Sequence, residues 1–253
     1  MKVILKMEKK NGLFKIMFNN NDLLIINFKN DLIEGKGKYK YSNGNIFEGI
    51  LNENYQPIKG KMKYLNNDEY VGEFENILRK GNGIMKYING EIYEGKWNNN
   101  EKNGNGILCF NQNDYNRVKN NLQKIQNNIF ELFNFEGSVY IGNFINDKKE
   151  GEGIFYINNN SNNDFFNNNI IYNGTFNNGQ KYGKGKVYFR NKSYFETYWI
   201  DDHKIDEKKE GIFYINDLEY KHENFQINEW IDFIHRKSYK ITRKDRIEKT
   251  IIR

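Results

Sequence analysis

The sequence predicts a mostly β chain: a single-layer, twisted antiparallel sheet of consecutive hairpins, with one inserted helix and one C-terminal helix. Only 38% of the residues are hydrophobic and the mean hydropathy is −0.90, which is too polar for a thick globular core. Aromatic residues nevertheless make up 16% of the chain, whereas disordered chains lack them. An interval of 23 residues recurs along the chain, as a repeat architecture requires.

The repeat is defined by aromatic residues and glycines in a fixed frame. Phe47, Tyr70 and Tyr93 lie 23 residues apart, and each is followed by a glycine two residues later. A large apolar residue follows two positions after that glycine, and a further glycine comes nine positions later, usually as the second of a Gly-x-Gly pair. The repeat-defining residues are Gly49, Leu51, Gly60, Tyr70, Gly72, Phe74, Gly81, Gly83, Tyr93, Gly95, Trp97, Gly104, Gly106, Tyr140, Gly142, Phe144, Gly151, Gly153, Tyr172, Gly174, Phe176, Gly183 and Gly185.

Alternation within each copy indicates that the copy is a hairpin. The odd-numbered residues of 93–97 are two aromatics and a glycine, and the even-numbered ones are charged, so the two sets occupy opposite faces of a strand. A polar loop over 98–103 then precedes a returning strand over 104–110. Between copies, Asn43-Gly44 and Asn89-Gly90 are typical of type I′ turns. Glycine inside a strand marks a close approach to the backbone, so we expect aromatic rings to lie flat on the sheet.

This frame resembles the MORN repeat, whose form is roughly Tyr-x-Gly-x-Trp/Phe, a short polar loop and Gly-x-Gly. The resemblance covers about residues 18–225, and seven copies in one frame make it specific. It implies a single twisted sheet and a role in binding or scaffolding. Ile26, Ile58 and Glu196 stand where the pattern has glycine, so we expect the copies that contain them to be less regular.

Two intervals longer than 23 residues mark insertions. The first carries apolar residues at spacings of three and four, which predicts an amphipathic helix over 114–133 with Asp114 as its N-cap. The second, 158–169, is rich in asparagine and is predicted to be a loop. We therefore divide the chain into N-terminal cap strands (1–23), a repeat sheet (24–225) and a basic C-terminal helix or tail (226–253). The apolar residues of the first insertion are Tyr115, Val118, Leu122, Ile125, Ile129 and Leu132.

Residues for catalysis, metal binding or cofactor binding do not form a recognisable group. The three histidines are scattered, and the lone Cys109 excludes an internal disulfide and a cysteine-based zinc cluster. The Gly-x-Gly pairs do not continue into a phosphate-binding loop. MORN repeats also occur fused to lipid kinases and lysine methyltransferases, but no stretch outside the repeats is long enough for such a domain. We expect no enzyme activity, no cofactor and no metal.

The positive charge is concentrated at the C-terminus. The segment 235–253 has eight Lys or Arg and two Asp or Glu, so its formal charge is +6, while the preceding 234 residues have 31 of each sign. Such a cluster is a candidate site for anionic lipid or another acidic partner, although charge runs also simply face water. Its basic residues are Arg236, Lys237, Lys240, Arg243, Lys244, Arg246, Lys249 and Arg253.

The favoured function is a non-enzymatic scaffold for protein–protein interaction, which the resemblance places in a cytoskeletal, ciliary or membrane-apposed assembly. The alternative is a peripheral membrane module that binds anionic phospholipids through the basic tail. We expect a cytoplasmic location, because the sequence shows no signal peptide or membrane span and has a single cysteine. A homodimer is compatible with the sequence, and no nucleic-acid partner is expected because the repeats are charge-neutral. The repeated tyrosines fit two interpretations, a packed row or an open binding groove.

Overall fold

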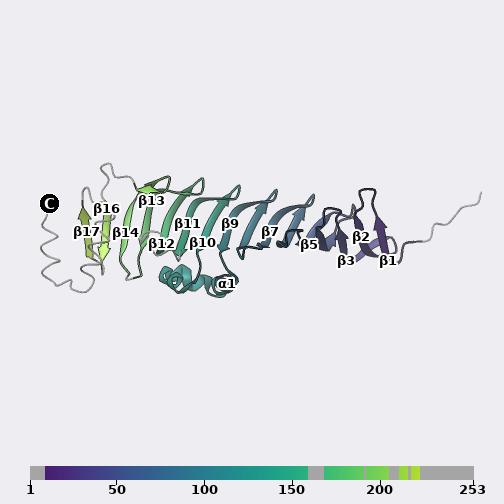
Figure 1. Cartoon of the computed structure of the whole chain (residues 1–253), viewed down its shortest axis with the longest axis horizontal. Helices are drawn as coiled ribbons and strands as arrows, with labels where there is room; N and C mark the ends of the chain where they lie inside the picture. Colours follow the sequence, from purple (N-terminus) through teal and green to yellow (C-terminus); the bar gives the residue numbers. More distant parts are fainter. Residues whose placement is uncertain (1–8, 159–167, 191, 205–210, 216–217, 223–253) are drawn as a thin grey trace, which may run out of the picture. The chain divides into compact units, whose positions relative to one another are not determined.

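The computed structural model describes residues 9–158, 168–190, 192–204, 211–215 and 218–222. It divides into two compact units, one of Met1–Gln112 with Ile145–Asp147 and one of Asn113–Phe144 with Lys148–Arg253. In each unit, consecutive strands pair as antiparallel hairpins in an open sheet (Figure 1). The predicted fold class, mostly β with consecutive antiparallel hairpins and an inserted helix, is confirmed. The predicted C-terminal helix lies outside the described residues, as does most of the asparagine-rich loop.

The described residues of the first unit form nine complete strands, each paired with the next along the chain. The strand β1 falls within the predicted N-terminal cap region. The strands are β1 (Gly12–Met17), β2 (Leu23–Lys29), β3 (Leu32–Lys40), β4 (Ile46–Leu51), β5 (Pro57–Lys63), β6 (Glu69–Glu75), β7 (Leu78–Lys86), β8 (Ile92–Asn98) and β9 (Glu101–Cys109).

The second unit contains the helical insertion and the remaining strands. The strand β14 pairs with both β15 and β16, because β15 is only two residues long. The elements are α1 (Gln112–Asn127), the 3-10 helix η1 (Ile129–Asn134), β10 (Val139–Ile145), β11 (Lys148–Asn158), β12 (Asn168–Asn177), β13 (Gln180–Tyr188), β14 (Tyr194–Ile200), β15 (His203–Lys204), β16 (Gly211–Ile215) and β17 (Leu218–His222).

The turns within repeats are tight, and those between repeats are wider, which reverses the predicted assignment. At Asn99–Asn100 both residues have positive φ, 49° and 71°, as a type I′ turn requires. The returning strand therefore starts at Glu101, not after a loop ending at residue 103. At Asn89-Gly90 only the glycine has positive φ, and the asparagine side chain instead accepts a hydrogen bond from the backbone N–H of Glu91 at 3.0 Å. The predicted type I′ turn is wrong there, and likewise at Asn43-Gly44, because asparagine can take either conformation.

A row of glycines crosses the sheet from strand to strand. In the first unit the register aligns each glycine with the next, Gly72 opposite Gly83 and Gly83 opposite Gly95, for example. The aromatic residues that define the repeat are buried on this face, so the core of the first unit is one layer of rings and aliphatic side chains lying on the sheet. The aligned glycines of the first unit are Gly37, Gly49, Gly60, Gly72, Gly83, Gly95 and Gly106, and those of the second are Gly153, Gly174 and Gly185.

The first glycine of a Gly-x-Gly pair has a different role from the second. Gly81 has a φ of +69° and lies where the pairing of β6 with β7 shifts register, as a β-bulge does. Gly104, Gly151 and Gly183 likewise have positive φ. Glycine at the first position therefore allows the left-handed backbone of the bulge, and glycine at the second makes room for a ring.

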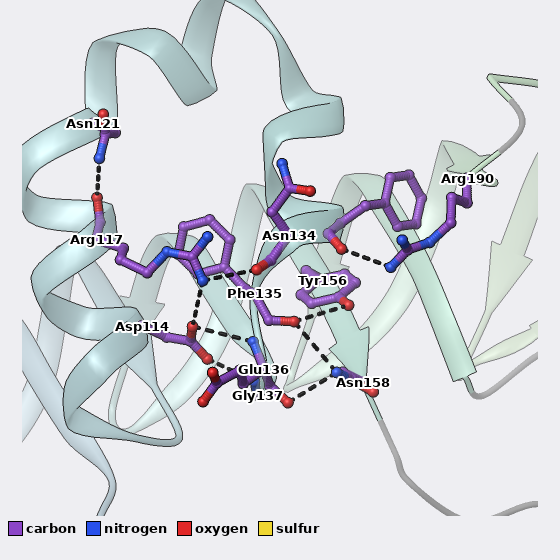
Figure 2. Close-up of polar contacts among 11 residues, drawn as sticks. Asp114, Arg117, Asn121, Asn134, Phe135, Glu136, Gly137, Tyr156, Asn158 and Arg190 are labelled. Carbon is purple, nitrogen blue, oxygen red and sulfur yellow. Dashed lines mark hydrogen bonds and ion pairs between the residues drawn. The ribbon is translucent and has the colours of Figure 1, made fainter.

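The helical insertion packs in the second unit (Figure 2). Helix α1 begins at Gln112, so the predicted N-cap Asp114 lies in its first turn; its carboxylate is fully buried and accepts hydrogen bonds from the N–H groups of Glu136 and Gly137. After η1, the Phe133 ring meets Tyr156 at 5.8 Å between centroids, and Arg190 donates to the Phe133 carbonyl at 2.7 Å. Four of the six apolar residues predicted for this segment are buried, namely Tyr115, Val118, Ile125 and Leu132.

The substitution Gly95→Val is expected to destabilise the protein strongly. A Cβ there would press into the Tyr93 ring and lie 2.7 Å from the Gly106 Cα, so a buried ring and two backbones would have to separate. We expect a loss of about 3 kcal/mol or more, at the upper end of overpacked cores. The matched control is Lys96→Val, an exposed position on the same strand where valine is favourable. Thermal unfolding followed by circular dichroism measures both, and equal melting temperatures would contradict the packing role.

Candidate functional site

In four repeats a tyrosine ring lies flat on a pair of facing glycines. Tyr93 covers Gly95 and Gly106, and its hydroxyl donates to the Lys96 carbonyl at 3.0 Å. Tyr70, Tyr140 and Tyr172 make the same bond, each to the carbonyl three residues later. Burial raises the pKa of these three hydroxyls well above the usual value, so they remain neutral donors. The tyrosine row is fully buried, and it is therefore a packed row and not an open groove.

A cation lies over the rings in four repeats, always two residues before the Gly-x-Gly pair. Three of them face the second aromatic residue of their repeat across the hairpin: Arg79 faces Phe74, Lys102 faces Trp97 and Lys181 faces Phe176. The Arg79 guanidinium lies 4.5 Å from the centroid of Trp97, and Lys149 Nζ lies 3.6 Å from that of Phe155. Cation–π attraction stabilises such pairs by about 0.5–2 kcal/mol. The four residues, named below as the cation row, are Arg79, Lys102, Lys149 and Lys181.

Two cations of this row are paired with an aspartate from the next tight turn. The Lys102 backbone N–H donates to Asp147 Oδ1 at 2.9 Å, and its Nζ lies 3.9 Å from the same oxygen. Lys181 makes the same two contacts with Asp202, again at 2.9 and 3.9 Å. The carboxylate thus binds both the backbone and the side chain of the cation residue.

The turn that faces Lys149 has a glycine at this position. The N–H of Gly179 donates to the Lys149 carbonyl at 2.9 Å, but Gly179 has no side chain to reach the lysine. Burial lowers the pKa of Lys149 to about 8, despite the opposing charge of Asp202. Burial also lowers the pKa of Lys102 and Lys181, and their aspartate partners oppose this effect.

The other face of the first unit has a groove that crosses β4–β8. Its volume is about 770 Å³ and its floor is the glycine row. Ile50 and Val71 are 47% and 49% exposed there, and Ile84 lies beside them. Because strands are spaced by about 4.8 Å, the groove is about 19 Å long, the length of about six residues of an extended chain. The charged residues along it are Lys36, Glu48, Lys59, Lys61, Glu73 and Glu94.

The structure shows where the repeat-defining residues lie, and it shows two features that the sequence analysis did not predict. The repeat-defining residues lie in the ring-and-glycine core or at its bulges, while the basic residues over 236–253 lie outside the described residues. The cation row and the groove were not predicted, although a Lys or Arg two residues before Gly-x-Gly is visible in the sequence. Over the described ranges, no three His, Cys, Asp or Glu side chains gather as a metal site requires, and no helix is long and apolar enough to cross a membrane.

Comparison with known proteins identifies the repeat. The family model described as MORN repeat matches residues 27–46, 70–92, 93–115, 140–161 and 172–194. No curated protein matches the sequence. Similar solved structures include the SAS-4 (dCPAP) TCP domain of Drosophila melanogaster in complex with a proline-rich motif of Ana2 (dSTIL), at 13% identity and TM-score 0.40, covering 83% of this chain and 88% of that one. A streptogramin B lyase is similar at 12% identity and TM-score 0.18, covering 85% and 69%. At these TM-scores neither likeness specifies a function.

The substitution Lys149→Met is expected to raise the free energy of unfolding at neutral pH, because it removes a desolvated charge. The pKa of Lys149 is about 8 in the fold, against an ordinary value of 10.5, so the unfolded chain binds more protons between these values. Wild-type stability therefore rises with pH through this window, and the advantage of methionine shrinks there. Chemical unfolding at a series of pH values measures this, with Lys96→Met as an exposed control. An advantage that is constant with pH would show that the lysine charge is not destabilising.

Proposed function

Because the chain is a MORN-repeat protein, we propose that it is a non-enzymatic scaffold that binds a protein partner along the groove of its first unit. The observation that carries this proposal is the asymmetry of the sheet. The aromatic residues are buried on one face, whereas the opposite face exposes aliphatic side chains in a groove.

The composition of the groove favours a polypeptide over other ligands. Exposed aliphatic residues give an apolar strip, and lysines and glutamates line the same groove. Two of these charges form ion pairs within the sheet, Glu48 with Lys38 and Lys61 with Glu69. A surface of mixed sign suits a segment with both apolar and charged side chains, whereas an anionic membrane would favour a surface of one sign. We place the complex in the cytoplasm, in a cytoskeletal, ciliary or membrane-apposed assembly.

Charged substitutions in the groove should release the partner. We expect Val71→Asp combined with Ile84→Asp to reduce partner recovery at least about tenfold, which corresponds to about 1.4 kcal/mol of binding free energy. The matched control is Ile88→Asp, an apolar residue that is 69% exposed and lies outside the groove. Each tagged full-length variant is expressed in the native cell, and the proteins that copurify are quantified by mass spectrometry. Equal loss with the control, or no loss with the groove variant, would rule out the groove.

A peripheral membrane role is the second candidate, and the observation that favours it is the formal charge of +6 on residues 235–253. Clustered Lys and Arg each contribute about 1 kcal/mol at an anionic surface. Binding of this kind weakens with salt, because screening shortens to about 3 Å at 1 M.

Co-sedimentation with phosphatidylserine-containing liposomes tests this second candidate. If the tail holds the protein at a membrane, the whole chain binds at low salt, releases at high salt, and loses binding when it is shortened to end at Ile234. If neither form binds at low salt, the membrane role is excluded. If both forms bind equally, the tail is not the lipid site.

A further inference from the structure

The tight turns that face the cation row can be compared with one another. We call a turn closed when its aspartate pairs with the lysine that it faces, and open when that position has no carboxylate. At Lys102 and at Lys181, an aspartate of the next tight turn places Oδ1 at 2.9 Å from the backbone N–H and 3.9 Å from Nζ. At Lys149 the same turn position is occupied by Gly179, which keeps the backbone hydrogen bond but has no carboxylate. Among the described residues, Lys149 is therefore the cation-row lysine that lacks an aspartate partner at this turn position.

The space for that anion is open. A Cβ at Gly179 would have no atom within 4 Å, so an aspartate side chain could start from this turn without a clash at its Cβ. Glu150 does not fill it, because its carboxylate accepts the backbone N–H of Asn178 at 2.8 Å and the alternation of the strand directs it to the opposite face from Lys149. Lys148 donates to the Asn178 side chain at 2.6 Å, so Lys148 is paired with the neighbouring residue of this turn.

The lysine is held in position by aromatic rings. Its Nζ lies 3.6 Å from the ring centroid of Phe155 and 5.4 and 5.6 Å from those of Tyr140 and Phe176. No hydrogen bond or ion pair of Lys149 Nζ with a described acidic residue accompanies these contacts. The charges that act on it are Asp202, which favours its protonated form, and Lys181, which opposes it.

We propose that the open position between Lys149 and Gly179 is a binding site for a carboxylate of a protein partner. The incoming carboxylate takes the place that Asp147 and Asp202 fill at their own turns, and a partner is anchored in the second unit by one aspartate, glutamate or C-terminal carboxylate. This inference rests on the proposed function only in taking the partner to be a protein. The chemistry of the site itself is defined by the two closed turns.

The test uses the full-length protein with ¹³C-labelled lysine, so that the Lys149 side chain is followed by nuclear magnetic resonance. The probe is the peptide acetyl-Gly-Asp-Gly-amide, with acetyl-Gly-Asn-Gly-amide as its uncharged match and inorganic phosphate at equal ionic strength as a second anion. The aspartate peptide should shift the Lys149 signal in a saturable way and raise its pKa from about 8 to about 9 or higher. The asparagine peptide should leave the signal unchanged.

Two variants complete the test: one fills the site at Lys149 with an aspartate, and the other creates an equivalent site at Lys181. The substitution Gly179→Asp should raise the Lys149 pKa in the absence of peptide and abolish the response of the Lys149 signal to the peptide. Aspartate is compatible with the positive φ of this turn position, because Asp147 and Asp202 adopt it at the equivalent turns. Conversely, Asp202→Gly should make the Lys181 signal respond to the same peptide. No response of Lys149 in the wild type, an unchanged response in Gly179→Asp, or an equal response to phosphate would overturn the carboxylate site. Because the probe is a peptide, these outcomes are independent of whether the groove variants release a partner.

Discussion

A tyrosine ring can lie flat on a β-sheet only where the facing residues beneath it have no Cβ, and the rest of this structure depends on that constraint. At Tyr93 the ring covers both Gly95 and Gly106, and its hydroxyl reaches the Lys96 carbonyl. The hydroxyl is thereby satisfied within its own strand, which a buried polar group requires. In the repeat of Phe47 the ring lies on Gly49 and Gly60 without such a bond, so the essential element is the ring on two glycines.

In the first unit, this arrangement buries one face of the described strands without a second layer of helices or strands packed on it. The rings of successive repeats meet edge to face, as Tyr70 meets Trp97 at 5.5 Å and Tyr172 meets Trp199 at 5.7 Å. The stems of the cation row cover the rings further, which is how long basic side chains shield apolar surface. The opposite face of the first unit then keeps its aliphatic residues accessible, so the buried core and the groove lie on different faces of the same strands.

Much of the fold could be predicted from the sequence, because the 23-residue frame and the alternation within it fix which residues share a face. The positions of the rings and glycines followed from this pattern, as did the inserted helix. The turns could not be predicted in the same way, because asparagine serves both as a left-handed residue at Asn99 and as a side-chain acceptor at Asn89. The cation row was overlooked because lysine and arginine at exposed strand positions are common. The groove depends on the register of five strands, which no single segment specifies.

The hydrogen bond between Lys102 and Asp147 joins residues 45 apart in sequence, whereas the equivalent bonds of Asn100 and Asp202 span 21 residues. The difference of 24 residues is the helical insertion, yet the bond has the same form. Closing a longer loop costs little additional free energy, since the cost grows only with the logarithm of length. The hydrogen bond thus forms in the same way whatever the length of chain between the two residues that it pairs. An inserted segment can therefore lengthen the chain between two residues of the first unit without loss of the hydrogen bond that pairs them.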